Sequence, residues 1–383
     1  MDARFKNPSP NVILAMMALA GVAIARALLP IEGPADSDFA LFLYPWMDSI
    51  RHQGLASIAG GFSEYTPPYI YVLNLAALIE PSVGTVAAIK LVNVPFVISC
   101  AWGIGAIIRQ STDDGDLGKI GAALILVCPS LLMDSFAHGQ CDAIFMSFLI
   151  WFVYFAILER PMLAAAMFGL ALSFKLQALF VSPLLLTLLL WRRMKLWHLA
   201  IIPAVYIVMM VPAAIAGRPW SELLTVYAGQ AGVMHELSLN APNPWWFLHG
   251  IVDYRSGVVA GLLAGVTAIA LLVWQSAKLP KSASSVLLIA ATSAALLPWV
   301  LPKMTARYFL LADLLTIGLA FARPGLWPAA VLMQIGSVIA MLAYFLGWGT
   351  AGLAIGPTTL ALFMLVYAIL TADVAHGRSA SRS

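Results

Sequence analysis

Charged side chains are scarce in this sequence. Only 10% of its 383 residues are Asp, Glu, Lys or Arg, and 62% are hydrophobic, whereas a soluble globular domain carries roughly 25% charged residues. Most of the surface therefore does not face water. The net charge of +3 gives no reason to expect nucleic acid as a partner. These deficits predict an integral membrane protein.

Cysteine is also rare, and regular alternation of polar and apolar residues is missing. The three cysteines, Cys100, Cys128 and Cys141, lie in or beside apolar runs. Lone thiols there behave as small hydrophobic side chains, so we expect neither a disulfide nor a metal site. A membrane β-barrel would need short alternating segments. The apolar runs are continuous instead, so helices are the expected spanning elements.

About twelve apolar runs have the composition of spanning helices, some of them short enough to be buried in a bundle. We predict an all-α polytopic bundle forming one integral-membrane domain over residues 1–383. The first run is expected to stay as a helix, because no clear cleavage site accompanies it. The expected spans are 11–30, 84–108, 119–133, 141–158, 162–175, 177–190, 197–216, 258–276, 283–300, 307–322, 326–346 and 351–371.

Two long hydrophilic connections, 31–66 and 217–257, interrupt these runs. The short run 69–80 could be a true span, but the cluster around Arg192 would then lie outside. Because Lys and Arg favour cytoplasmic loops, we predict that 69–80 lies at the outer face, so that 31–83 is one outer loop with interfacial helices. Thirteen of the 21 basic residues are then on the inner side: Arg4, Lys6, Arg109, Lys119, Arg160, Arg192, Arg193, Lys195, Lys278, Lys281, Arg323, Arg378 and Arg382.

Unusual polar residues gather near the predicted outer ends of the helices. Ionisable groups at membrane depth are costly unless paired or hydrated, so each one is a candidate functional residue. Under the predicted topology all of them face the same side of the membrane. The candidates are Asp36, Asp38, Glu64, Tyr65, His138, Gln140, Asp142, Lys175, Gln177, Asn240, Asn243, Lys303 and Arg307.

Structural roles remain open for the residues of the first outer loop. Asp36 and Asp38 could cap the helix expected from Phe39, since Asp favours N-caps. The aromatic residues around them suit an interfacial belt. The role of Pro67 and Pro68 could be purely structural, to bend the chain back toward the bilayer.

Structural alternatives also exist for the later candidates. His138 and Asp142 lie four residues apart and could form a hydrogen-bonded pair on one helix face. Lys175 has no acidic neighbour in the sequence, so a phosphate group or a distant carboxylate is needed to neutralise it. Lys303 and Arg307 could be ordinary charges at outer helix ends.

A metal site has weaker support. Asp36 and Asp38 could bind a divalent cation through their oxygens, but two carboxylates alone are a weak signal. The sequence has no HExxH motif and no paired CxxC motif of the kind that marks metal sites. No metal or cofactor is therefore predicted.

Carboxylates and cations on one outer face suit sugar transfer from a polyprenyl phosphate whose tail lies between helices. One carboxylate would act as general base on an acceptor hydroxyl. Lys and Arg would hold the phosphate and stabilise charge on the departing oxygen. No nucleotide-binding signature is present, which fits chemistry outside the cytoplasm.

Six ordered segments carry a resemblance to a known superfamily: SDFALFLYPW, SEYTPPYIY, HGQCDAIF, SFKLQALFVSP, LNAPNPWW and PKMTARYFLLADLL. The chain resembles the GT-C multi-spanning glycosyltransferases, and most of all the bacterial relatives of the dolichyl-phosphate-glucose-dependent glucosyltransferases of N-glycan assembly. The resemblance covers most of the chain. It implies a GT-C-like bundle, an inverting reaction and transfer of a glucose-type or mannose-type hexose to a glycan, lipid or other acceptor. It also implies a bacterial inner membrane with a periplasmic site.

The resemblance assigns roles to particular residues. The first outer loop supplies the catalytic Asp in this superfamily, and Asp38 matches it best, with Asp36 as the near alternative. Relatives often carry a His and a Glu between Met and Arg in the late segment, where this chain has Thr305 and Ala306. This departure argues against acid–base chemistry there and leaves Lys303 and Arg307 as phosphate contacts.

Other function classes fit less well. A transporter or flippase of a lipid-linked sugar would need charges through the bilayer centre and, often, repeated halves. A polymerase or ligase of lipid-linked glycans usually depends on a large outer loop late in the chain. The sequence shows neither feature of a transporter, and its acidic residues lie in the first outer loop rather than in a late one. A non-catalytic scaffold is the least favoured class.

Overall fold

The computed structural model describes residues 8–33, 37–230, 235–248, 250–346 and 351–380, and 82% of it is helical. Short 3-10 and π-helices, labelled η, precede or extend many of the α-helices. The elements are α1 (Pro10–Leu28), η1 (Phe39–Leu43), α2 (Tyr44–Gln53), η2 (Gly54–Ala59), α3 (Pro67–Val83), α4 (Thr85–Leu91), α5 (Val94–Thr112), α6 (Gly115–Leu126), α7 (Pro129–Leu132), η3 (Met133–His138), α8 (Asp142–Ile157), α9 (Pro161–Phe174), η4 (Leu176–Val181), α10 (Ser182–Leu190), η5 (Leu196–Ala200), α11 (Ile201–Ile215), α12 (Trp220–Gln230), β1 (Ser238–Leu239), α13 (Trp245–Leu248), α14 (Tyr254–Ser276), α15 (Ala283–Val300), β2 (Met304–Thr305), η6 (Ala306–Phe309), α16 (Leu310–Ala322), η7 (Pro324–Leu326), α17 (Trp327–Leu346), η8 (Ala351–Ala354) and α18 (Ile355–Ala380).

The predicted all-α polytopic fold is confirmed, but the predicted number of twelve spans is not. Among the described residues, seven helices are long and apolar enough to cross a membrane, or eight if the bent pair 115–126 and 129–138 forms one span. The predicted spans 141–158, 162–175 and 177–190 correspond to the shorter apolar helices α8, α9 and η4 with α10. Most residues of α8 are buried, and a helix enclosed by other helices need not match the bilayer by itself.

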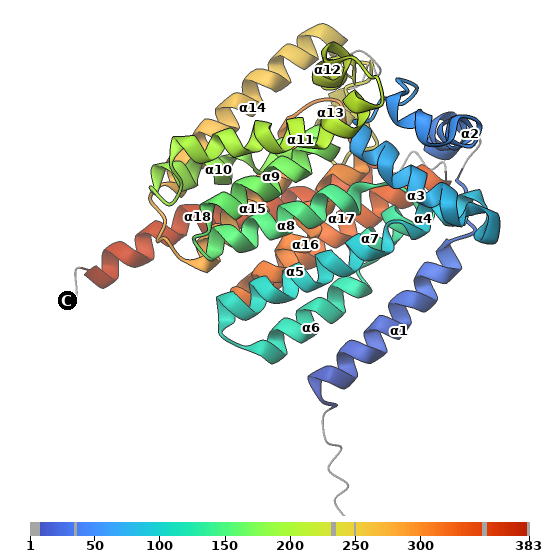
Figure 1. Ribbon diagram of the computed structural model, residues 1–383. Coiled ribbons are helices and arrows are strands. Elements are labelled where there is room, and N and C mark those ends of the chain that lie inside the picture. Colours follow the sequence, from blue (N-terminus) through green and yellow to red (C-terminus); the bar gives the residue numbers. More distant parts are fainter. Residues whose placement is uncertain (1–7, 34–36, 231–234, 249, 347–350, 381–383) are drawn as a thin grey trace, which may run out of the picture.

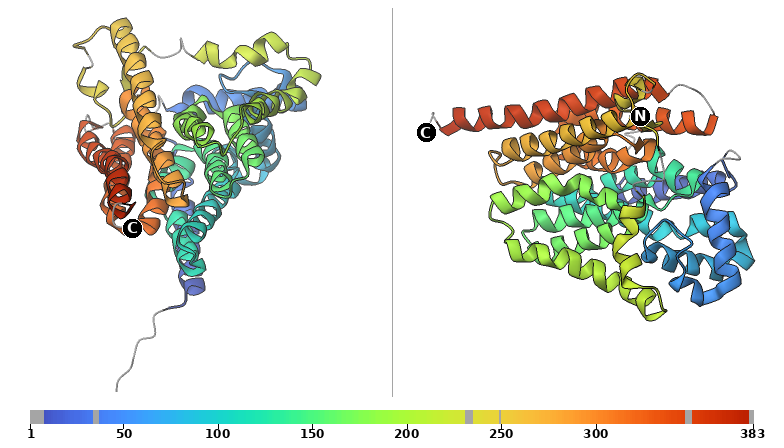
Figure 2. Two further views of the ribbon diagram at one scale, coloured as in Figure 1. Left: turned by 90° about the vertical axis from the view of Figure 1, so that its left-hand side faces the viewer. Right: turned by 90° about the horizontal axis from the view of Figure 1, so that it is seen from above.

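Two groups of helices are seen from above in Figure 2: α8–α11 lie along one side and α14–α18 along the other. Helices α8, α9 and α11 pack in sequence, as do α15, α16, α17 and α18. Helix α15 joins the groups by contacting α8 and η4. The three cysteines are free and buried, as the apolar runs around them predict.

Helices of the two long connections gather at one end of the bundle (Figure 1), where α2, α3, α12 and α13 lie. The predicted helix 69–80 is α3, which begins at Pro67 and Pro68. Proline is well suited to the first helical turn, because a backbone N–H at that position would have no hydrogen-bond acceptor within the helix. The two prolines therefore begin a helix. Its position at the membrane surface stays a prediction, as do the bounds of the outer loops.

The second long connection returns to the bundle through a short pair of strands. Strand β1 pairs in parallel with β2, with Ser238 opposite Met304 and Leu239 opposite Thr305. The backbone N–H of Lys303 also donates to the carbonyl of Leu237 at 2.8 Å. These bonds bring the second connection beside the late polar segment.

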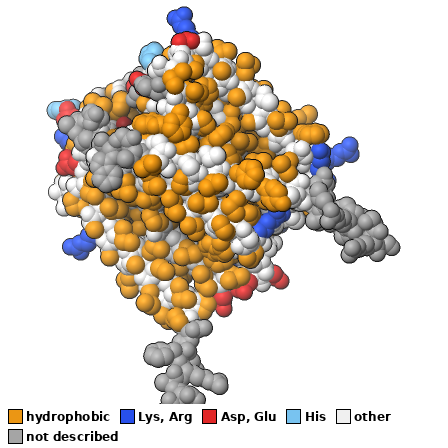
Figure 3. Space-filling view, turned by 180° about the vertical axis from the view of Figure 1, so that it is seen from behind, with side chains coloured by type: hydrophobic (Ala, Val, Ile, Leu, Met, Phe, Trp, Pro, Cys, Tyr) orange, Lys and Arg blue, Asp and Glu red, His pale blue; other side chains and the backbone are white. Residues whose placement is uncertain are grey.

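The surface that Figure 3 shows from behind is mainly hydrophobic, and its charged side chains lie toward the edges of the view. Large apolar side chains are exposed on α1 and α14, including Leu19, Val22, Leu263 and Val266. Exposed apolar surface on this scale suits contact with lipid rather than water. The protein is therefore an integral membrane protein, as its composition predicts.

Candidate functional site

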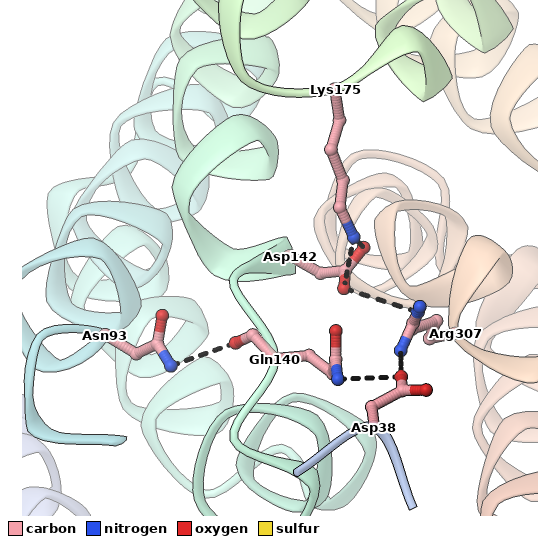
Figure 4. A network of polar contacts seen from close by, with 6 residues as sticks. All are labelled: Asp38, Asn93, Gln140, Asp142, Lys175 and Arg307. Atoms are coloured by element: carbon pink, nitrogen blue, oxygen red, sulfur yellow. Dashed lines mark hydrogen bonds and ion pairs between the residues drawn. The ribbon is translucent and has the colours of Figure 1, made fainter. Parts of the chain in front are cut away.

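A network of charged side chains joins the first loop to the helical bundle (Figure 4). Asp38 lies just before η1, and its carboxylate Oδ2 accepts hydrogen bonds from Arg307 Nη1 at 2.6 Å and Gln140 Nε2 at 2.8 Å. Arg307 belongs to η6, and Gln140 lies in the turn between η3 and α8. Three segments far apart in the sequence thus meet at one carboxylate.

The network continues from Arg307 into the core. Arg307 Nε lies 3.7 Å from Asp142 Oδ2, and Lys175 Nζ donates to both oxygens of Asp142 at 2.9 Å. Asp142 thus supplies the distant carboxylate that can neutralise Lys175. Carboxylates and cations alternate along this chain of contacts, so each charge has an opposite neighbour, as buried charges require.

Exposure differs along the network. The side chains of Asp142 and Lys175 are 0% and 3% exposed, whereas those of Asp38 and Arg307 are 33% and 17% exposed. The Asp38 end can therefore meet a substrate, and the Asp142 end is enclosed. Lys175 Nζ also lies 5.2 Å from the ring centroid of Tyr65.

Two carboxyl groups of the first loop, those of Asp38 and Glu64, have shifted pKa values. Burial raises the pKa of Asp38, but the charge and hydrogen bond of Arg307 outweigh burial and hold this pKa below its usual value. Glu64, at the far end of the loop, has a raised pKa because of burial and then repulsion by Asp38. Asp38 is therefore ionised at neutral pH and accepts a proton poorly while Arg307 holds it.

Two cavities adjoin Asp38. The larger has a volume of about 520 Å³ and includes the aromatic side chains of Trp246, Tyr344 and Phe345. The smaller, of about 170 Å³, is lined by Lys175 and by polar groups. The side chains that line both cavities are Asp38, Phe42, Gln140, Leu239, Thr305 and Arg307. Asp38 and Arg307 therefore stand where a donor and an acceptor could meet.

Most of the other candidates from the sequence line one of these cavities. His138 and Asn240 line the larger, and Glu64, Tyr65 and Gln177 line the smaller. Besides the enclosed Asp142, two described candidates line neither cavity. Asn243 is buried and donates to the carbonyls of Pro298 and Leu301, and Lys303 lies 5.7 Å from the ring centroid of Tyr254. The roles of all these residues stay proposals.

His138 does not pair with Asp142, the alternative considered for these two residues. Asp142 contacts Lys175 and Arg307, while the ring of His138 lies against those of Tyr344 and Phe345, with centroids 4.6 and 4.3 Å away. A turn separates η3, which ends at His138, from α8, which begins at Asp142. The four-residue spacing therefore does not place them on one helix.

Several residues at the site are not predictable from the sequence. Glu236, Trp246, Tyr344 and Phe345 line the larger cavity, and the backbone N–H of Asp38 donates to the hydroxyl of Tyr344 at 3.4 Å. Tyr344 and Phe345 lie in the last turn of the apolar helix α17, and aromatic residues are common where a helix reaches a membrane surface. The sequence carried no signal that separates them from such a belt.

Metal binding was considered for Asp36 and Asp38. Asp36 lies outside the residues that the structure describes. Within the described residues no group of three or more His, Cys, Asp and Glu side chains is arranged to hold a metal ion. The role of Asp36 stays a prediction, and a cation at this pair of carboxylates stays the weaker, untested alternative.

The chain matches a known glycosyltransferase family over most of its length. The family described as "ALG6, ALG8 glycosyltransferase family" matches residues 86–368. This range holds Gln140, Asp142, Lys175 and Arg307, and begins after the loop that carries Asp38. None of the curated proteins compared with the chain matches it.

Proposed function

The chain belongs to the ALG6, ALG8 glycosyltransferase family and is a glycosyltransferase of GT-C type, and we propose that it moves a hexose from a polyprenyl-phosphate donor to an acceptor hydroxyl with inversion. The hexose is of the glucose or mannose type, and the acceptor is a glycan, a lipid or another hydroxyl compound. The observation that carries this proposal is the Asp38–Arg307 pair between two cavities.

Asp38 is proposed to be the general base. An acceptor hydroxyl in the larger cavity would give its proton to Asp38 as its oxygen attacks the anomeric carbon. The bond from that carbon to the phosphate oxygen breaks as the new glycosidic bond forms. Polyprenyl phosphate leaves on the opposite side, which inverts the anomeric configuration. Glu64, beside the smaller cavity, would orient a substrate hydroxyl.

The donor phosphate is proposed to lie at the smaller cavity. Arg307 and Lys175 both line it, and their positive charges would stabilise the departing phosphate. Arg307 is the more accessible of the two, because Asp142 already engages Lys175. A phosphate beside Arg307 would also compete with Asp38 for the guanidinium, which would release Asp38 and make it a stronger base.

The proposed location is the bacterial inner membrane, with the site on the periplasmic face. Thirteen basic residues at predicted inner positions support this orientation, because Lys and Arg favour cytoplasmic loops. An impermeant thiol reagent can test it on single cysteines at Leu55 and Leu196, whose side chains are 76% and 77% exposed. In intact cells Leu55→Cys should be labelled and Leu196→Cys should not. The reverse pattern would contradict the orientation.

Turnover of a lipid donor by purified protein tests the proposed function. The protein in lipid nanodiscs is given polyprenyl-phosphate glucose or mannose, radiolabelled in the sugar, with an extract of bacterial membranes as acceptor source. We expect release of polyprenyl phosphate and labelling of a membrane component with one of the two donors. Transfer from nucleotide sugars, with none from either lipid donor, would contradict the proposal.

A further inference from the structure

A fully buried lysine lies where the chain leaves the first helix. Lys90 of α4 is 0% exposed, and its ammonium donates to the backbone carbonyls of Leu28 at 3.3 Å, Leu29 at 2.9 Å and also Ile31. Helix α1 ends at Leu28. The last carbonyls of a helix have no partners within it, and a cation there is favoured by the helix dipole. Lys90 thus fixes the start of the first loop.

The same ammonium reaches the residue that follows Asp38. Lys90 Nζ lies 5.4 Å from the ring centroid of Phe39, a distance at which a cation is attracted to an aromatic face. Phe39 is 1% exposed, so its ring is enclosed. One side chain therefore contacts the chain on both sides of Asp38, at Ile31 and at Phe39.

Gly139 completes this arrangement. Its φ of +65° favours glycine, and a Cβ there would overlap Phe39 Cε2 and lie 3.3 Å from Lys90 Cε. Only a residue without a side chain leaves room for the Phe39 ring against Lys90. The turn at Gly139 also carries Gln140, which donates to Asp38. The turn thus seats Phe39 and binds Asp38 at once.

We propose that Lys90 is a positioning residue for Asp38, holding the carboxylate in register with Gln140 and Arg307. This inference rests on the proposed role of Asp38 as general base. Lys90 acts through the backbone at Ile31 and the ring of Phe39, and it touches no substrate. A misplacement of about 1 Å at a catalytic group can cost about 100-fold in rate, so loosening either contact should impair transfer.

A distance measurement tests the positioning role of Lys90 without relying on activity. Spin labels on cysteines at Leu41 of η1 and Leu263 of α14, which are 57% and 64% exposed, report the loop position relative to the bundle. A second pair, at Ile207 and Leu263, reports the bundle alone. Lys90→Met keeps the apolar stem and removes all donors. It should broaden the distance distribution of the first pair and leave the second unchanged.

Kinetics with polyprenyl-phosphate hexose as the donor tests the consequence. Lys90→Met should lower kcat by about 10- to 100-fold while the donor KM changes by less than about threefold. Lys90→Arg keeps donors at this place and should restore most of the loss. Lys119→Met is the matched control, because Lys119 is a half-exposed lysine that pairs with Asp116, and it should behave as wild type.

Clear outcomes would overturn the proposal. A loop distance in Lys90→Met as narrow as in wild type would do so, whatever happens to activity. Equal losses in Lys90→Met and Lys90→Arg would do so too, as would a broadened loop with normal turnover. If Lys90→Met cannot be recovered folded, Gly139→Ala displaces Phe39 from the other side and should broaden the same distance. If the wild type turns over neither donor, the proposed function fails, and the loop distance alone then decides whether Lys90 holds the loop.

Discussion

Two ion pairs of similar chemistry lie in one network but differ in their surroundings. Lys175 holds both oxygens of Asp142, and both side chains are almost fully buried. Arg307 binds one oxygen of Asp38, and both side chains remain partly exposed beside two cavities. An enclosed pair cannot exchange partners without leaving a bare charge, whereas a partly exposed pair can. The difference supports the proposal that Asp38–Arg307 meets both substrates, while Asp142–Lys175 mainly fixes the geometry and offers one cation to the donor phosphate.

The largest expected effect is on Asp38. Asp38→Asn keeps the shape of the side chain and removes the basic oxygen, so transfer should fall by about 10²–10⁴-fold while donor binding stays largely intact. Asp48→Asn is the matched control, since Asp48 is an exposed acid of the same loop that pairs with Arg51. Radiolabelled donor turnover and donor binding measure the two effects. Loss in Asp36→Asn with near-normal turnover in Asp38→Asn would make Asp36 the base, and normal turnover in both would refute the mechanism.

Substitution in the buried Asp142–Lys175 pair should mainly lower the free energy of unfolding. Lys175→Ala leaves Asp142 with a buried charge, which costs about 3–5 kcal/mol when one partner of such a pair is removed. It should also weaken use of the lipid donor, and unchanged turnover would show that Lys175 does not contact the phosphate. Heating with a thiol-reactive dye measures unfolding, because all three cysteines are buried. Lys119→Ala, at an exposed pair, should stay within about 0.5 kcal/mol of wild type.

The smallest expected effect is on the pH dependence of kcat/KM, which reports groups of the free enzyme. Arg307 lowers the pKa of Asp38, so wild-type transfer should stay level as pH falls to about 5. Arg307→Gln removes this charge and leaves the burial that raises the pKa, so the residual activity should decline from a higher pH. The Asp38–Arg307 ion pair stabilises the folded protein at pH values above the ordinary pKa of Asp. This stabilisation is lost only as the pH falls through the lowered pKa of Asp38. If the pH profiles of kcat/KM for wild type and Arg307→Gln coincide, Arg307 does not control the pKa of Asp38.

Much of the fold followed from the sequence because long apolar runs leave helices as the only choice. The number of spans did not follow, since a run such as 162–175 has the same composition whether it crosses a membrane or is packed inside a bundle. The gathering of the polar segments on one side was also predictable from the sequence. Which charged residues pair with each other was not. Arg307 and Asp38 are 269 residues apart, and Lys175 and Asp142 are 33 apart. Lys90 and Tyr344 stand in or beside apolar runs, and only packing brings them to the first loop.

The central claim is that Asp38 removes a proton from the acceptor, and an acceptor without a proton tests it most directly. Azide is already an anion, so its attack on the anomeric carbon needs no general base. In Asp38→Ala, transfer to the natural hydroxyl acceptor should be lost, while added azide should accept the hexose from the polyprenyl-phosphate donor to give a glycosyl azide of inverted configuration. Equal loss of both transfers in Asp38→Ala, with azide accepted by the wild type, would contradict the account.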